Sequence, residues 1–133
     1  MTVTAVWDRE LSSVAIIYFE SPWTWEEYYL MNEHLIEDML SGKPANSVDM
    51  IVSFVNSDIL PSGLFTHFQR SARELHSQIR TAVMTGMYGP MQSIFAIIMR
   101  LNPNLPYTIL YADSVPAARE IIREVRASSG ETG

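Results

Sequence analysis

A chain of 133 residues, of which 47% are hydrophobic, has the size of one domain with a single core. It carries 15 acidic and 9 basic residues, a net charge of -6, and so lacks the basic patch that nucleic acid or an anionic membrane surface would require. The absence of cysteine excludes disulfides and thiolate sites, and no apolar run is long enough to span a bilayer. The N-terminus lacks the pattern of a signal peptide, and we therefore expect a cytoplasmic protein.

The first third of the chain predicts a hairpin followed by a helix. The runs VTAVWD at 3–8 and VAIIYF at 14–19 are rich in β-branched and aromatic residues and are separated by a polar stretch, as in two antiparallel strands. From Trp23 to Ser41, apolar residues recur at helical spacing. Thr24 and Glu27 have the spacing of a capping box, which predicts where this helix begins.

The middle of the chain predicts a buried strand and a second helix. Gly42 and Pro44 are expected to end the first helix, and VDMIVSFV at 48–55 is almost continuously apolar, as in a central strand covered on both faces. A second helix is predicted from Gly63 to about Arg80. Its apolar side is expected to carry Leu64, Phe65, Phe68, Ala72, Leu75 and Ile79.

The remaining segments alternate between strand and helix. AVMTGM at 82–87 and YTILYA at 107–112 predict strands, and helices are expected at 90–101 and 114–126. The order β-β-α-β-α-β-α-β-α indicates an α/β fold with a single mixed sheet and helices packed on it. We expect one domain over residues 1–126 and a flexible C-terminal tail over 127–133.

This element order, the helix WTWEEYYLMNEHLIEDML, the strand VDMIVSFV with its join PSGLF, and the ending YTILYADSVPAAREIIREV resemble the STAS domain family. Within that family the chain is most similar to the SpoIIAA-like anti-sigma factor antagonists, and the resemblance covers nearly the whole sequence. It implies a non-enzymatic regulatory module that binds a protein partner, either a kinase or an anti-sigma-like regulator.

The resemblance also implies a switch residue. In family members that act as switches, the turn after the central strand reads Asp-Ser-Ser-Gly, and the partner kinase phosphorylates the second serine. The matching positions here are Leu60, Pro61, Ser62 and Gly63, so the second serine and the glycine are retained, whereas the acidic residue and the first serine are replaced. Ser62 is the residue expected to be phosphorylated.

The residues around Ser62 allow two interpretations. A serine at a helix N-terminus commonly caps the helix by accepting a backbone hydrogen bond, and this alone is reason enough for its presence. A phosphate at the same position would meet free N–H groups and the positive end of the helix dipole, and would change a partner-facing surface. The sequence leaves both interpretations open.

Three joins between strands and helices are expected to meet at the carboxyl edge of the parallel strands, where ligands and partners bind in open α/β sheets. The joins are 56–63, 86–89 and 112–114, and they also bring Asp113 and Ser114 to this edge. Met87 and Tyr88 are expected either to form a contact surface or to cover the core. The predicted partner-binding residues are Asp58, Leu60, Pro61, Ser62, Gly63, Phe65, Thr66, Met87 and Tyr88.

Motifs for catalysis and cofactors are absent from the sequence. There is no phosphate-binding loop, no dinucleotide fingerprint and no paired-histidine zinc helix, so no metal or cofactor is expected. His34, His67 and His76 are expected to be surface or partly buried helix residues. A hydrolase would require one of them within about 3 Å of Ser62.

Two further hypotheses remain. The richness in Met, Phe, Tyr and Trp also fits a binding domain for a small apolar, lipid-like ligand, which would require a sizeable apolar cavity. Trp23, Trp25, Tyr28 and Tyr29 lie close together in the first helix, and they fit either the core or a surface that pairs two copies into a homodimer.

Overall fold

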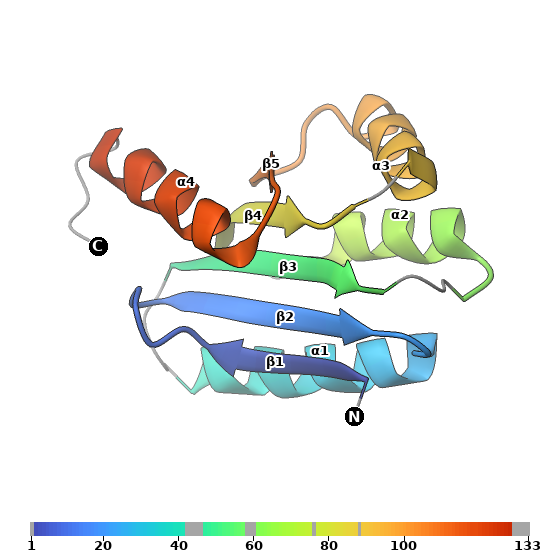
Figure 1. The fold of residues 1–133 in the computed structure, drawn as a ribbon, viewed down its shortest axis with the longest axis horizontal. Helices are drawn as coiled ribbons and strands as arrows, with labels where there is room; N and C mark the ends of the chain where they lie inside the picture. Colours follow the sequence, from blue (N-terminus) through green and yellow to red (C-terminus); the bar gives the residue numbers. More distant parts are fainter. Residues whose placement is uncertain (1, 42–46, 58–60, 76, 88, 129–133) are drawn as a thin grey trace.

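The computed structural model describes residues 2–41, 47–57, 61–75, 77–87 and 89–128 (Figure 1). The chain is an α/β protein with a single five-stranded mixed sheet and four helices, in the expected order. The strands are β1 (Val3–Trp7), β2 (Val14–Glu20), β3 (Val48–Asn56), β4 (Ile79–Thr85) and β5 (Thr108–Ala112). The helices are α1 (Trp25–Leu40), α2 (Leu64–Glu74), α3 (Gly89–Leu101) and α4 (Val115–Ser128).

The strands lie in the sheet in their chain order, β1-β2-β3-β4-β5. β1 and β2 are antiparallel, with Val3 opposite Phe19 and Trp7 opposite Ala15, whereas β2 to β5 are all parallel. Because the parallel strands follow one another in one direction, right-handed connections place α1, α2 and α3 on the same face of the sheet. Only α4, which follows the last strand, lies on the other face (Figure 1).

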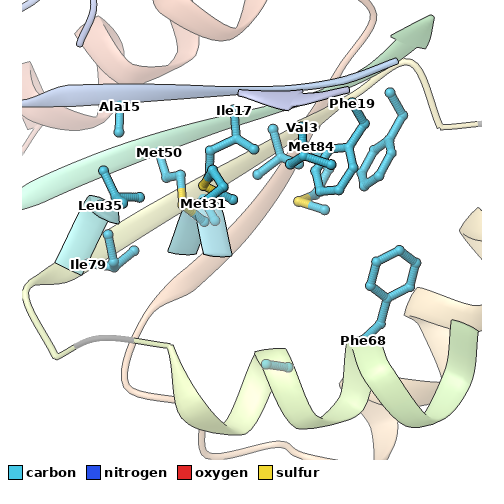
Figure 2. Close-up of a cluster of buried hydrophobic side chains, with 14 of the residues drawn as sticks. Val3, Ala15, Ile17, Phe19, Met31, Leu35, Met50, Phe68, Ile79 and Met84 are labelled. Atoms are coloured by element: carbon cyan, nitrogen blue, oxygen red, sulfur yellow. The ribbon is translucent and has the colours of Figure 1, made fainter. Parts of the chain in front are cut away.

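The larger core lies between the sheet and helices α1, α2 and α3 (Figure 2). Met31, Leu35 and Met39 of α1 are buried in it at intervals of four residues, which places them on one side of the helix. Phe68 of α2 packs at 4.9 Å between ring centroids against Phe95 of α3. The smaller core lies under α4, whose buried Ala118 and Ile122 face strand residues.

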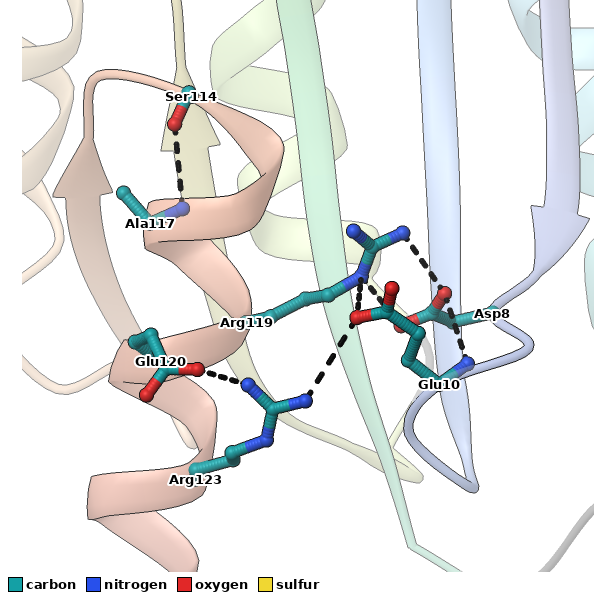
Figure 3. A network of polar contacts seen from close by, with 7 residues as sticks. All are labelled: Asp8, Glu10, Ser114, Ala117, Arg119, Glu120 and Arg123. Carbon is teal, nitrogen blue, oxygen red and sulfur yellow. Dashed lines mark hydrogen bonds and ion pairs between the residues drawn. The ribbon is translucent and has the colours of Figure 1, made fainter.

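Ion pairs attach α4 to the β1–β2 hairpin (Figure 3). Arg119 donates from Nε and Nη2 to the two carboxylate oxygens of Asp8, each at 3.0 Å. Burial opposes the charged form of Asp8, but the bonds from Arg119 and from the backbone N–H groups of Glu10 and Leu11 outweigh it and hold the pKa of Asp8 below its usual range. The hairpin and α4 are thereby fixed together.

A second, more deeply buried ion pair fixes the far end of α4. Arg126 donates from Nε to Asp49 at 2.8 Å, and Arg80 donates to the same carboxylate oxygen at 3.2 Å. Arg126 also donates to the backbone carbonyl of Ser13 at 3.3 Å. The side chains of Asp49 and Arg126 are almost fully buried, with 1% and 4% of their residue surfaces exposed. A buried charge of this kind is tolerated only when it is paired.

The capping box predicted for α1 is confirmed, because the Glu27 N–H donates to Thr24 Oγ1 and the Thr24 N–H donates back to the Glu27 carboxylate. The boundary predicted for α2 is wrong: the helix ends at Glu74, and Leu75 is already extended. Ile79 continues the helical spacing of apolar residues, yet it begins β4 and pairs with Val48. The spacing of apolar residues alone could not distinguish a longer helix from the start of a strand, because Ile79 would be buried in both.

Helix α4 continues to Ser128, two residues beyond the expected end of the domain. The predicted stop of α1 at Gly42 and Pro44, and residues 129–133 of the predicted tail, lie outside the described residues. The four aromatic residues expected either in the core or at a pairing surface belong largely to the core: Trp23 is buried, and Trp25 and Tyr28 pack against it.

Candidate functional site

Ser62 lies two residues before Leu64, the first residue of α2, and the interpretation that Ser62 caps this helix is wrong. The N-cap is Gly63, and none of the side chains that the structure describes makes a capping hydrogen bond there. Gly63 has a φ of 80°, a left-handed conformation that glycine adopts without a steric penalty. The side chain of Ser62 is therefore released from the capping role, and Ser62 is exposed.

Another serine at the same edge behaves as the sequence rules for caps predict. Ser114 precedes α4 and accepts a hydrogen bond from the Ala117 N–H at 3.2 Å. Its hydroxyl thus satisfies one of the backbone donors that every helix start leaves without a partner. At α2 no side chain within residues 61–75 or the other described ranges makes the corresponding capping bond. Two serines in similar sequence positions therefore have different roles.

Aromatic side chains from α1 hold the backbone at Ser62. The indole N–H of Trp25 donates to the carbonyl oxygen of Ser62 at 2.8 Å. The Trp25 ring also stacks on the imidazole of His67, with 4.3 Å between ring centroids and an interplanar angle of 15°. The start of α1 and the start of α2 are thereby joined through one tryptophan.

His67 is held on its other side by Tyr29, whose hydroxyl lies 2.8 Å from His67 Nδ1. When Tyr29 donates this hydrogen bond, Nε2 carries the imidazole proton. A Cβ atom built on Gly63 would lie 3.6 Å from Nε2, so this nitrogen faces the Ser62–Gly63 join. His67 makes no hydrogen bond with the Ser62 hydroxyl, which a Ser–His nucleophile pair would need. Of the other histidines, His34 is exposed on α1, and His76 lies outside the described residues.

The other predicted partner-binding residues are placed as follows. Phe65 and Thr66 are exposed on the first turn of α2, and Pro61 is half-buried. Met87 is half-buried and packs against the larger core, so it is the edge of that core rather than a free contact residue. Asp58, Leu60 and Tyr88 lie outside the described residues.

Two exposed apolar residues at the carboxyl edge were missed by the sequence analysis. Val55, near the end of β3, is 59% exposed, and Tyr111 of β5 is 50% exposed. A groove of about 190 Å³ lies beside Tyr111 and is also lined by Met87, Gln92 and Asp113. The signal available for Val55 was its place as the last residue of the apolar run at 48–55, next to the join expected at 56–63.

Gly86 sets the close approach of two strands at this edge. Its φ is 70°, and a Cβ atom added there would lie 2.7 Å from the backbone nitrogen of Val55. Only glycine fits this approach without displacing the backbone. The end of β4 therefore lies directly against Val55 and keeps the exposed valine in place.

The interior between the sheet and helices α1, α2 and α3 contains a mostly apolar cavity of about 60 Å³. Tyr28, Asn32, Ser71 and Tyr107 contribute polar groups to its lining. Burial raises the pKa of Tyr28. Burial also raises the pKa of Tyr107 to about 12. The Tyr107 hydroxyl donates to the Ala72 carbonyl at 2.7 Å. The Ser71 hydroxyl lies close to Tyr28 and partly offsets this rise in the pKa of Tyr28. The Ser71 hydroxyl is buried, and it makes no hydrogen bond of normal geometry with the described residues.

Within the described ranges, no three His, Asp or Glu side chains come together as a metal ion would require. The same part of the chain contains no helix that is both long and apolar enough to cross a membrane. Comparisons with protein-family models, curated proteins and solved structures give no match to this chain. The function is therefore inferred from the geometry of the site.

Proposed function

We propose that this protein is a non-enzymatic regulatory module, similar to an anti-sigma factor antagonist, that binds a protein partner at the carboxyl edge of its sheet. Phosphorylation of Ser62 would switch that binding. The observation that carries the proposal is the exposed Ser62 next to Gly63, the N-cap of α2, where no described side chain makes a capping hydrogen bond. A kinase can reach such a hydroxyl without first breaking a capping bond.

The surroundings of Ser62 favour a phosphate. Backbone N–H groups at a helix N-terminus and the helix dipole both attract anions. The Nε2 atom of His67 faces the same join and adds a donor when Tyr29 occupies Nδ1. The bond from Trp25 holds the Ser62 backbone and leaves the side chain free. A phosphate would thus have partners within the protein.

The same edge offers apolar surface to a protein partner. Phe65 stands exposed one turn beyond Ser62, and Val55 and Tyr111 are exposed at the ends of their strands. Exposed aromatic residues are enriched at protein interfaces. A phosphate on Ser62 would add up to about two negative charges beside this surface, and like charges or desolvation would then alter partner binding.

The alternative function, binding of a lipid-like ligand, depends on the cavity beneath α2. Pockets for small molecules usually measure about 300 to 1,000 Å³. A cavity of about 60 Å³ is much smaller, so it leaves little room for an acyl chain. The surface at Ser62 requires no such space, and for this reason we favour the partner-binding module.

The proposal is tested by pull-down from the native cell extract with wild type, Ser62→Ala and Ser62→Asp, together with mass spectrometry of the isolated protein. Ser12→Asp is the matched control, because Ser12 is exposed in the hairpin at the opposite end of the sheet. We expect phosphate on Ser62, and a partner that binds wild type, Ser62→Ala and Ser12→Asp but not Ser62→Asp. Equal binding by all four proteins and unmodified Ser62 would overturn the proposal.

A further inference from the structure

The outer faces of α1 and α2 differ in charge, although both helices lie on the same face of the sheet. We propose that these two faces form an interface between two copies of this chain, with α1 of each copy lying against α2 of the other. The proposal does not depend on phosphorylation of Ser62, because it rests on the outer faces of the helices rather than on the join before α2.

The outer face of α1 is an apolar stripe bordered by acids. Its exposed residues include Glu26, Leu30, Glu33, Glu37 and Leu40, which recur at intervals of three and four and therefore share one side of the helix. Leu30 is 46% exposed and Leu40 is 71% exposed. The buried residues of α1 occupy the opposite side, so these two leucines are not part of the core.

The charge of α1 has one sign. Between Trp25 and Leu40 the sequence contains five carboxylates and neither lysine nor arginine. Like charges one turn apart on a helix repel each other and slightly destabilise it. A surface that keeps such an arrangement without internal cations is complementary to a cationic partner. Two exposed leucines among these acids indicate that the partner also supplies apolar area.

The outer face of α2 has the complementary character. Arg70 and Arg73 are exposed, and Glu74 is the one acid between Leu64 and Glu74. Arg70 pairs with Glu74 at 3.1 Å and Arg73 donates to Asn102 at 3.2 Å, so this face keeps an excess of one positive charge. Exposed Phe65 supplies apolar area beside the arginines. A groove of about 330 Å³ runs along this face and is lined by Phe65, Thr66, Gln69, Arg70, Arg73 and Glu74.

A two-fold axis accounts for both faces at once. In an isologous dimer, any contact made by one copy is repeated by the other. If the axis runs along the boundary between α1 and α2, the acidic stripe of each copy meets the arginines of the other. A rotation that placed α1 on α1 would instead bring acids together, so charge selects this arrangement.

The apolar and the charged residues are expected to contribute differently to the stability of the dimer. Exposed ion pairs contribute little to stability, because solvent and salt screen them. Affinity would therefore come mainly from burying Leu30, Leu40 and Phe65, whereas the charges would select the orientation and make association sensitive to salt. We expect a reversible dimer that weakens as ionic strength rises.

The test is sedimentation equilibrium of the purified chain at concentrations up to about 1 mM. We expect the mass to rise from 15.1 kDa toward twice that value, and the dissociation constant to increase when salt is raised from about 0.05 to about 0.5 M. A chain that remains monomeric over the whole concentration range would overturn the proposal.

Charge reversal locates the interface. Glu33→Lys with Glu37→Lys, and separately Arg70→Glu with Arg73→Glu, should each weaken self-association at least about tenfold through repulsion between like charges. An equimolar mixture of the two variants should form a heterodimer, because the reversed faces are complementary again. Glu124→Lys is the control, since this exposed residue lies on α4 across the sheet, and its dissociation constant should match wild type.

A folding defect in the arginine variant would not stop the test. Circular dichroism reports whether each variant is folded, and Leu30→Asp changes an exposed residue without altering the core. Leu30→Asp should also weaken the dimer at least about tenfold, because it removes apolar contact and adds an acid. A dimer whose dissociation constant is unchanged by Leu30→Asp or by either charge reversal would place the interface elsewhere and overturn the proposal.

Discussion

The two ends of the sheet are stabilised in different ways. At the amino end of the parallel strands, Asp49 is buried and paired with Arg126 and Arg80, and Asp8 is paired with Arg119. At the carboxyl end, the described residues expose Val55 and Tyr111, and Ser62 stands before a helix with no side-chain cap. One end is fixed by buried ion pairs, and the other exposes apolar side chains.

Under the proposed function, this difference would separate the residues that stabilise the fold from those that bind a partner. Residues that bind a partner cannot have all their groups satisfied internally, because the partner must supply some of the contacts. Binding sites can therefore be locally unfavourable in free energy, and the stability of the rest of the structure offsets this. The ion pairs at the amino end fix both the start and the end of α4, so the carboxyl end can remain open without loosening the sheet.

The largest effect is expected at the buried pair. Arg126→Ala should lower the free energy of unfolding by about 3 kcal/mol, because it leaves Asp49 buried with one fewer cation. Urea unfolding at neutral pH measures the change. For comparison, at the carboxyl end of the sheet, Tyr111→Ala should lower the free energy of unfolding by less than about 1 kcal/mol, because Tyr111 is half exposed to water. Similar losses for the two variants would remove the distinction between the ends.

The ion pair between the hairpin and α4 should give a smaller, pH-dependent effect. Asp8→Asn should lower the free energy of unfolding by about 2 kcal/mol at neutral pH, because it removes a charge-assisted pair. The folded state lowers the pKa of Asp8 from 3.8, so the stabilisation is present above pH 3.8 and is lost as pH falls through the folded value. The difference between wild type and variant should therefore shrink in acid.

Urea unfolding of both proteins across the acid range checks this dependence. Glu10→Gln is the matched control, because Glu10 also contacts Arg119, at 3.4 Å, but is largely exposed. Its effect should stay below about 1 kcal/mol at every pH. If the Asp8→Asn difference were the same in acid as at neutral pH, the ion pair would not be the source of the stabilisation.

The smallest changes in the free energy of unfolding are expected at the starts of helices α1, α2 and α4, and they should show which of these helices has a side-chain cap. Thr24→Ala and Ser114→Ala should each lower the free energy of unfolding by about 1 kcal/mol, because both side chains accept a capping bond. Ser62→Ala should change it by less than about 0.5 kcal/mol, since Ser62 makes no such bond. Thermal or urea unfolding of the three variants measures this, and a loss at Ser62 equal to that at Ser114 would indicate that Ser62 caps α2 in solution.

Much of the fold follows from local patterns in the sequence. The hairpin, the buried strand β3, the capping box of α1 and the alternation of strands and helices depend on residues that are near one another in the chain. Their spacing and turn chemistry are sufficient, because hydrogen bonds within a helix and the alternation within a strand are local. The single mixed sheet follows from that order together with the handedness of its connections.

The details of the site depend on the tertiary structure. Ser62 and Ser114 have similar sequence contexts, but the left-handed Gly63 and the bond from Trp25, 37 positions away in the chain, are specific to Ser62. The end of α2 likewise depended on the pairing of Ile79 with Val48. Sequence alone determined which elements form, since their signals are local. Only the packed structure decided which serine caps a helix and which buried acid meets which arginine, because these contacts join residues far apart in the chain.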